Sequence, residues 1–209
     1  SYVPEYPFKE AMGSGVRLRD EKLAPFPRTE YAVKVNRQEY YAIITHMDQQ
    51  IGRIMEALKK TGKADNTYIF FTADHGLAVG SHGLLGKQNL YEHSMGTPMV
   101  ITGPGIPRGQ SSDALVYLYD LFPTICSWAG VKVPEKVEGR SLAEVITGDR
   151  PFVRETLFTA YENKMRAVRD ARYKLIRYPQ INHTQLFDLR SDPHELKNLA
   201  AVPAQADRV

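Results

Sequence analysis

Hydrophobic residues between positions 31 and 60 recur at steps of three and four, the spacing of one face of an α-helix. Polar and charged residues fill the positions between them. The apolar positions are Tyr40, Ile44, Met47, Ile51, Ile54 and Leu58. The pattern predicts a long amphipathic helix over 31–60, and Gly62 is well placed to end it because glycine is common just after a helix.

Two continuous apolar and β-branched runs follow, at 67–72 and 98–102. Such runs are typical of strands buried on both faces, as in a parallel sheet. The segment between them, 73–96, is rich in glycine and histidine and is predicted to be a loop. Residues 1–30 are rich in proline, glycine and charge, which predicts an extended surface segment.

The pattern of apolar and polar residues changes again toward the C-terminus. Asp120 is a predicted N-cap, with Pro123 in the first turn of a helix ending near Gly130, and a second short helix is predicted over 141–147. Strand candidates then follow at 155–160, 165–169, 173–178 and 185–189, before a last predicted helix through Leu196 and Leu199. Strands at this spacing predict a small antiparallel sheet. We therefore expect an α/β domain over 1–150 and a small α+β subdomain over 151–209.

Composition narrows the function classes. The 209 residues are 43% hydrophobic and 24% charged, with a formal charge of +3. This charge is too small to indicate nucleic acid or a membrane surface as partner, and there is no apolar run long enough for a membrane span. The lone Cys126 lies in an apolar stretch, so we expect a buried thiol.

The candidate chemistry lies in the loop after the first strand. Asp74 and His75 stand at the carboxyl end of that strand, where α/β sheets bind ligands. A carboxylate suits Ca²⁺ or Mg²⁺, and an imidazole suits Zn²⁺. Lys87 would place a cation near a sulfate or phosphate group, and His82 and His93 are possible proton donors. These residues together indicate a site for an anionic ester.

A structural interpretation competes with this one. Asp74 could cap a helix, His75 could pack against the next turn, and Lys87 could be a solvated surface charge. Two ligands are also too few for a metal site, so further ligands would have to come from elsewhere.

At this point the sequence resembles the sulfatase family of the alkaline-phosphatase-like superfamily, over nearly the whole chain. The joint order of several motifs makes the resemblance specific. In the loop the motifs are Thr72-Ala73-Asp74-His75-Gly76, Gly80-Ser81-His82-Gly83, Gly86-Lys87 and Tyr91-Glu92-His93. Further along they are Asp120-Leu121-Phe122-Pro123-Thr124, Val137-Glu138-Gly139-Arg140-Ser141-Leu142, Arg172-Tyr173-Lys174-Leu175-Ile176 and Leu186-Phe187-Asp188-Leu189.

The resemblance implies a fold and a set of roles. Residues 1–150 would be the C-terminal half of an alkaline-phosphatase-like domain, with a mixed sheet flanked by helices. Asp74 and His75 match two ligands of the family's active-site cation, calcium, with magnesium as the alternative. Lys87 matches the catalytic lysine that contacts the sulfate group, and His93 and Gln88 lie where substrate-binding residues are expected.

The sequence departs from the family pattern at the nucleophile. Sulfatases use a formylglycine made from the first residue of a Cys/Ser-x-Pro/Ala-x-Arg motif, which this chain does not contain, since Cys126 is followed by Ser127-Trp128-Ala129. We therefore expect the chain to be the C-terminal part of a longer protein, to need that protein's N-terminal part, and to be inactive alone. Gly96 stands where many relatives carry arginine.

Three functions follow as hypotheses. The first is hydrolysis of a sulfate ester of a small molecule or carbohydrate. The second is a phosphatase or phosphonate monoester hydrolase of the same superfamily, and the third is a non-catalytic protein that binds sulfated ligands. A periplasmic or secreted location is typical of bacterial relatives, and the sequence itself shows no targeting signal.

Overall fold

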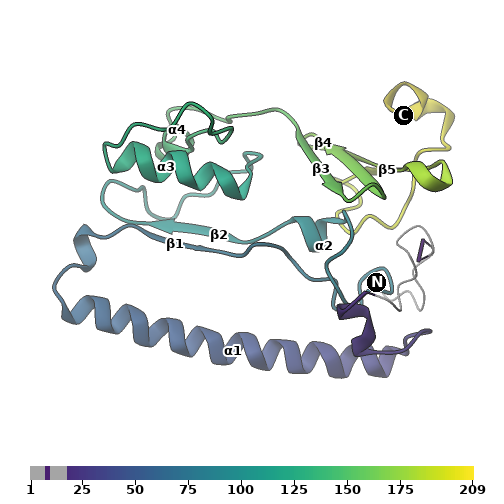
Figure 1. Ribbon diagram of the computed structural model, residues 1–209, viewed down its shortest axis with the longest axis horizontal. Helices are drawn as coiled ribbons and strands as arrows, with labels where there is room; N and C mark the ends of the chain where they lie inside the picture. The colour runs from purple at the N-terminus through teal and green to yellow at the C-terminus, as the bar shows by residue number, and fades with distance from the viewer. Residues whose placement is uncertain (1–7, 10–17) are drawn as a thin grey trace. The chain divides into compact units, whose positions relative to one another are not determined.

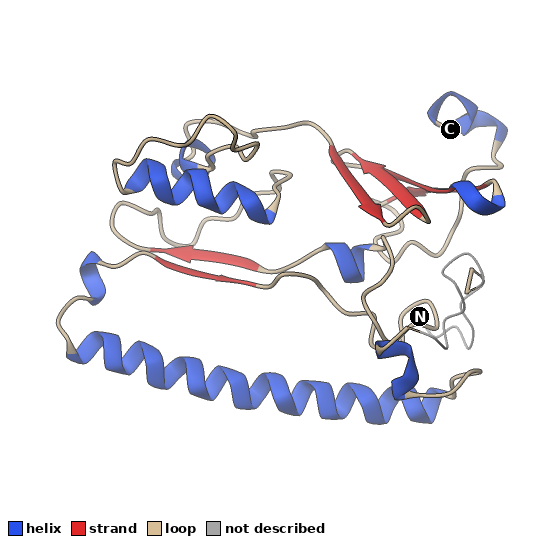
Figure 2. Ribbon diagram, viewed as in Figure 1, coloured by secondary structure: helices blue, strands red, loops and turns tan. Residues whose placement is uncertain are grey.

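A computed structural model describes residues 8–9 and 18–209 of the chain. It contains two compact units, Ser1–Pro104 and Gly105–Val209, which are described separately below (Figures 1 and 2). The division expected near residue 150 falls inside the second unit, and it stays a prediction. Among the described residues, no helix has both the length and the apolar character needed to cross a membrane.

The first unit is dominated by the helix α1, Glu30–Lys60 (Figure 1), as predicted. The Thr29 side chain caps it by accepting a hydrogen bond from the backbone N–H of Ala32 at 3.1 Å. Val33 is the residue of α1 that is buried, whereas Met47 and Ile54 on the predicted apolar stripe are exposed. The periodicity thus predicted the helix correctly, but other described residues do not bury Met47 and Ile54 on its apolar stripe.

The strands β1, Ile69–Thr72, and β2, Met99–Thr102, form a two-stranded antiparallel sheet after the short 3-10 helix η3, Ala64–Asn66. Ile69 pairs with Thr102, and Thr72 pairs with Met99. The expectation of strands buried on both faces, as in a parallel sheet, is wrong here. An apolar run reports how hydrophobic a strand is but not which segments cover it, and in this unit Phe71 and Val100 are exposed.

The loop between these strands folds back on itself and carries the short helix α2, Glu92–Met95. The backbone N–H of Gly76 donates to the carbonyl of Ser94 at 2.8 Å, and the N–H of Ala78 donates to the carbonyl of Gly86 at 3.0 Å. The start of the loop therefore lies directly against its end. A Cβ added to Gly76 would sit 2.1 Å from the carbonyl oxygen of His93, so this approach requires glycine.

The segment before α1 contradicts the prediction of an extended surface segment, as far as it is described. It contains the 3-10 helix η2, Asp20–Leu23, and the side chains of Glu21 and Arg28 are buried. The rest of the predicted segment, residues 1–7 and 10–17, lies outside the described residues.

The second unit begins with three short helices: η4, Leu118–Asp120; α3, Leu121–Trp128; and α4, Ala143–Thr147. Both predicted helices are present, and Cys126 on α3 is buried as expected. Asp120 occupies the N-cap position, but its side chain makes no capping hydrogen bond. That part of the prediction is wrong because the carboxylate is used elsewhere.

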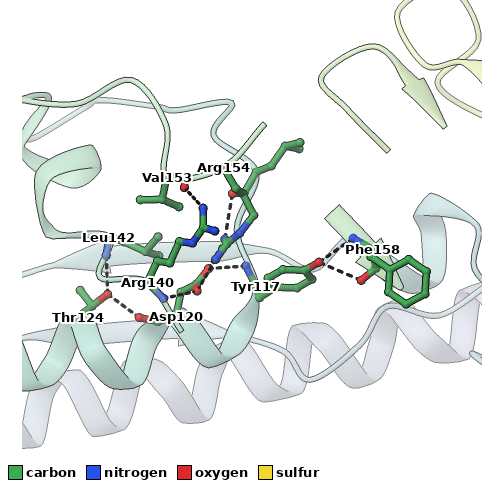
Figure 3. Close-up of polar contacts among 9 residues, drawn as sticks. Tyr117, Asp120, Thr124, Arg140, Leu142, Val153, Arg154 and Phe158 are labelled. Atoms are coloured by element: carbon green, nitrogen blue, oxygen red, sulfur yellow. Dashed lines mark hydrogen bonds and ion pairs between the residues drawn. The ribbon is translucent and has the colours of Figure 1, made fainter. Parts of the chain in front are cut away.

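The buried carboxylate of Asp120 joins three parts of this unit (Figure 3). It accepts hydrogen bonds from the backbone N–H groups of Tyr117, at 2.7 Å, and Arg140, at 2.8 Å. It also forms a two-pronged ion pair with Arg154, whose Nη2 lies 2.7 Å from Oδ1. Tyr117 continues the network, because its hydroxyl bonds to the backbone N–H and carbonyl of Phe158.

A four-stranded antiparallel sheet completes the unit, in the order β3-β4-β5-β6. The strands are β3, Leu157–Tyr161; β4, Met165–Arg169; β5, Tyr173–Tyr178; and β6, His183–Asp188. A 3-10 helix, η5, Pro179–Ile181, follows β5, and another, η6, Pro203–Arg208, lies after β6 near the last residue. The predicted antiparallel sheet is therefore confirmed, with β4 and β5 at the predicted bounds.

The last predicted helix, through Leu196 and Leu199, is wrong. The Asp192 carboxylate instead accepts from the backbone N–H of Leu196 at 2.8 Å, which makes a turn. Glu195 takes a left-handed φ of 54°, which interrupts helix formation, and its buried carboxylate pairs with Lys174 of β5 at 2.8 Å. A tertiary ion pair has overridden the local propensity.

The Asp188–Arg172 ion pair gives a pH prediction. Arg172 binds the carboxylate at 2.8 Å and, with the hydrogen bonds it donates as the largest cause, lowers the pKa of Asp188 from 3.8 to about 2. A lowered folded-state pKa adds stability above the unfolded pKa that disappears as the pH falls through the folded one. We expect Asp188→Asn to lower the urea midpoint at pH 6, with the difference from wild type shrinking between about pH 4 and pH 2.

The control is Glu135→Gln, which neutralises an exposed carboxylate in the same unit. Its difference from wild type should be small across the same range. A midpoint difference for Asp188→Asn that stays constant from pH 6 to pH 2 would contradict the role assigned to the pair.

Gly76 gives a second prediction. Gly76→Ala places a methyl group against the His93 carbonyl, so the two ends of the loop must separate. We expect a loss of roughly 1–3 kcal/mol in the free energy of unfolding, measured by urea denaturation. The matched control is Gly52→Ala on α1, where a Cβ would meet nothing within 4 Å. This control should be neutral or stabilise by up to about 1 kcal/mol, and an equal response of the two variants would refute the packing argument.

Candidate functional site

The two predicted metal ligands and the predicted lysine lie together in the first unit. Asp74 and His75 follow the carboxyl end of β1, and the Asp74 Oδ2 atom lies 3.4 Å from the His75 Nε2 atom. Lys87, twelve residues further along, reaches back so that its Nζ contacts the same Nε2 atom. The loop therefore brings a carboxylate, an imidazole and an ammonium group to one point.

The contacts of His75 define how its ring is used. The Nδ1 atom lies 2.8 Å from the carbonyl oxygen of Gly76, and a carbonyl only accepts hydrogen bonds. An ammonium group only donates, so the Lys87 contact requires a lone pair on Nε2. The network thus assigns the proton to Nδ1 and turns the Nε2 lone pair toward Lys87.

The site is open on the side of the carboxylate. The Asp74 side chain is 81% exposed and that of His75 is 32% exposed, while Lys87 is half-buried. An exposed carboxylate beside a half-buried imidazole and ammonium can be reached by a charged ligand from solvent.

Gln88 lies beside Lys87 and is tied to η2. Its Oε1 accepts from the backbone N–H of Lys87 at 3.3 Å, and its Nε2 donates to Asp20 Oδ2 at 3.4 Å. The pKa of Asp20 is lowered, first by the hydrogen bond from Arg19 at 2.6 Å, with smaller contributions from Gln88 and Lys87. Asp20 therefore presents a negative charge close to the predicted lysine.

His93 belongs to a cluster of rings with His82 and Tyr91. The His82 ring stacks on Tyr91 at a centroid distance of 3.9 Å, and His93 Nε2 lies 3.1 Å from His82 Nδ1. His82 itself has a φ of 55°, an uncommon conformation for a residue other than glycine. The two histidines predicted as proton donors are thus neighbours, and the role of His93 in substrate binding stays a prediction.

Sequence reasoning missed the buried pair behind the loop. The Glu21 carboxylate accepts from the backbone N–H groups of Leu85 and Gly86, and it pairs with Arg28. The contacts with Leu85 and Gly86 span more than sixty positions of sequence. The available signal was an acidic residue and an arginine flanking the proline-containing stretch 24–27, but no local pattern links that stretch to the loop.

Among residues 8–9 and 18–209, the side chains of His, Cys, Asp and Glu form no group of three or more suited to hold a metal ion. Asp74 and His75 are therefore a pair of candidate ligands. Calcium binding stays a prediction, and any complete site would need further ligands.

Two family models match the sequence. The model described as "Sulfatase" matches residues 2–131, and that described as "N-sulphoglucosamine sulphohydrolase, C-terminal" matches residues 80–208. The loop with Asp74, His75 and Lys87 lies inside the first of these matches.

Individual proteins are similar as well. The choline-sulfatase of Rhizobium meliloti is 35% identical over 184 residues, which cover 85% of this chain and 36% of that protein. The solved structure of the phosphonate monoester hydrolase of Silicibacter pomeroyi has a TM-score of 0.84 and 29% identity, covering 100% of this chain and 47% of that one. A structure in complex with its substrate D-glucosamine-2-N,6-O-disulfate has a TM-score of 0.79 and 27% identity, covering 91% of this chain and 41% of that one.

These likenesses confirm the alkaline-phosphatase-like α/β fold, and the chain spans less than half the length of each of these proteins. The family match covers well over half of the chain and includes the loop in which the acidic, imidazole and ammonium groups meet. The chain belongs to the sulfatase family.

Proposed function

We propose that the protein containing this chain hydrolyses sulfate esters, and that the chain contributes Asp74, His75 and Lys87 to the active site. The observation that carries the proposal is the meeting of the Lys87 ammonium group and the Asp74 carboxylate at the Nε2 atom of His75. Membership of the sulfatase family supports the reaction class.

Lys87 is the group we assign to the sulfate. Its ammonium is a compact charge on a flexible stem, and its half-buried position limits screening by solvent. A cation next to sulfate oxygens is most useful when negative charge builds up on them in the transition state. Lys87 therefore acts as an electrostatic catalyst in this proposal, with Gln88 and His93 as substrate-binding residues.

The donor set of Asp74 and His75 fits a divalent cation. A carboxylate oxygen is a ligand that Ca²⁺ and Mg²⁺ prefer, and the contact of Nδ1 with Gly76 orients the His75 ring. The Nε2 atom, which contacts Lys87 in the structure, becomes available to the ion when Lys87 turns to the sulfate group. We propose calcium, with magnesium as the alternative, and we assign these two residues to hold it. The bound ion would help neutralise the charge of the sulfate group.

The nucleophile is assigned outside these residues. No Cys/Ser-x-Pro/Ala-x-Arg motif occurs among the 209 residues. The proposal therefore places the formylglycine, and the remaining cation ligands, in a part of the protein beyond this chain; this chain covers 36% and 41% of the lengths of two relatives.

The substrate class we propose is a sulfated carbohydrate or sulfated small molecule. One structurally similar protein was solved with a disulfated glucosamine as its substrate, and a curated relative is a choline-sulfatase. The exposed edge of the site at Asp74 is compatible with either a sugar or a smaller alcohol as the leaving group.

The reaction is tested by replacing Lys87 in the full-length protein. We expect Lys87→Ala to lower kcat for an aryl sulfate by roughly 100–1000-fold, because one preorganised charge next to the reacting group is lost. The control is Lys60→Ala, an exposed lysine at the end of α1, which should leave kcat unchanged. The isolated 209-residue chain should show no turnover.

The same assay with a phosphonate monoester separates the alternative hydrolase. Wild-type rates that are higher on the phosphonate than on the sulfate ester would contradict the proposal. So would full sulfatase activity in Lys87→Ala.

Cation binding is tested on the chain by calorimetric titration with calcium chloride. With two ligands the dissociation constant should be on the order of 1 mM or weaker. Asp74→Asn and His75→Ala should each weaken binding further, whereas Asp65→Asn, at an exposed aspartate of η3, should not. Calcium binding that is equally strong in Asp74→Asn and wild type would exclude Asp74 as a ligand.

A further inference from the structure

We propose that Glu21 and Arg28 position Lys87: their buried ion pair, called here the Glu21–Arg28 clamp, fixes the backbone immediately before the lysine. The consequence for catalysis rests on the proposed function, but the effect on the loop does not. Neither residue is a candidate to touch substrate, and both act through the segment 83–86.

The carboxylate of Glu21 holds the two residues that precede Lys87. Its Oε1 accepts from the N–H of Gly86 at 2.7 Å, and its Oε2 accepts from the N–H of Leu85 at 3.1 Å. A carboxylate that receives adjacent backbone N–H groups fixes the orientation of both peptide planes. The peptide planes before Lys87 therefore fix the position of its Cα atom.

Arg28 closes the clamp from the other side. Its Nη1 lies 2.8 Å from Glu21 Oε2 and also donates to the carbonyl oxygen of Gly83, while Nη2 donates to the carbonyl of Glu21 at 2.8 Å. The guanidinium therefore binds the carboxylate and the loop together. Its planar fork, which lysine lacks, makes these contacts simultaneously.

The loop is tightly packed around Gly86. Residues 83–86 are all buried. A Cβ added to Gly86 would sit 2.9 Å from Glu21 Oε1 and 2.9 Å from the Cβ of Asp20, so the loop backbone lies directly against η2. The neighbouring Asp20 binds Gln88, and η2 thus contacts the chain on both sides of Lys87.

Stability alone does not explain a pair in this position. The Arg28 side chain is 0% exposed and that of Glu21 is 2% exposed. Burial lowers the pKa of Arg28, which reflects the cost of removing its charge from water, while Glu21 opposes this shift. Apolar residues of similar size commonly stabilise a core as well as a buried ion pair or better. What the charged pair adds is directional bonds to three backbone groups of the loop: Gly83, Leu85 and Gly86.

The second unit offers a matched control. Asp120 and Arg154 are also a buried carboxylate and guanidinium, and Asp120 also accepts from two backbone N–H groups (Figure 3). The backbone groups it holds are those of Tyr117 and Arg140. Asp120→Asn thus makes the same chemical change as Glu21→Gln at a pair that binds a different segment.

The first test is hydrogen exchange, measured by mass spectrometry on a peptide covering residues 83–88 in the full-length protein. We expect Glu21→Gln and Arg28→Lys to speed exchange at Leu85 and Gly86 by at least about tenfold, because the acceptor or its partner is weakened. Asp120→Asn should leave this peptide unchanged. If Glu21→Gln does not fold, Arg28→Lys, which keeps the charge, carries the same test.

The second test is a double-mutant cycle for aryl sulfate hydrolysis. We expect Glu21→Gln to lower kcat roughly 10–100-fold with little change in KM, because a misplaced catalytic group acts on the transition state. In a Lys87→Ala background the same change should have almost no further effect, since there is no longer a lysine to position. Asp120→Asn should have the same effect in both backgrounds.

The outcomes separate the clamp from the function. Unchanged exchange at Leu85 and Gly86 in both clamp variants overturns the clamp, whatever the activity. An equal loss of kcat from Glu21→Gln with and without Lys87 also overturns its positioning role. A wild-type protein without sulfatase activity would refute the proposed function, while the exchange experiment would still decide whether the clamp holds the loop.

Discussion

The buried ion pair between Glu21 and Arg28 is the interaction on which the candidate site depends. The loop after β1 has no long element to define its path, since α2 is four residues long. Its backbone is fixed instead by polar contacts: Glu21 on Leu85 and Gly86, and Ser94 on Gly76. A loop built in this way can carry exposed reactive groups at its surface because these polar contacts hold its backbone in place.

The second unit uses the same solution for a different purpose. The Asp120 carboxylate receives two backbone N–H groups and the Arg154 guanidinium, and it holds η4 to the segments at 140 and 154. In both units a buried acid satisfies donors that short helices and loops leave without partners. The local energetic cost of burying charge is offset by bonds that a purely apolar core could not make to the backbone.

The sequence predicted what depends on neighbouring residues. The period of α1, the alternating strands β4 and β5, and the placement of Asp74 and His75 at a strand end were all legible from local spacing. The meeting of Lys87 with His75 was proposed from the residue types in the loop, and the family resemblance supported it, because no local pattern shows that a loop returns on itself. Burial of β1 on both faces was predicted wrongly, since hydrophobicity alone does not identify the covering segment.

Long-range ion pairs could not be predicted from local sequence patterns. Glu195 illustrates it: a helical pattern around Leu196 gave way to a turn because the Glu195 carboxylate is drawn to Lys174 on β5. Glu21 and Arg28 lie in the stretch 1–30 that was predicted to be an extended surface segment, because charged residues in a proline-containing stretch are usually solvated. Only the fold shows that their partners lie more than fifty positions away, in the loop.

The chemistry of lysine explains why such a clamp is useful here. A lysine side chain has four rotatable bonds, and fixing it costs about 2 kcal/mol of conformational entropy. Its half-buried position restricts the side chain, while Glu21 restricts the backbone at its base. Fixing the base of the side chain before a ligand arrives means that less of this cost falls on the transition state, and preorganisation of this kind is what makes a single charge catalytically effective. The acid that shapes the site is thus one that no ligand needs to touch.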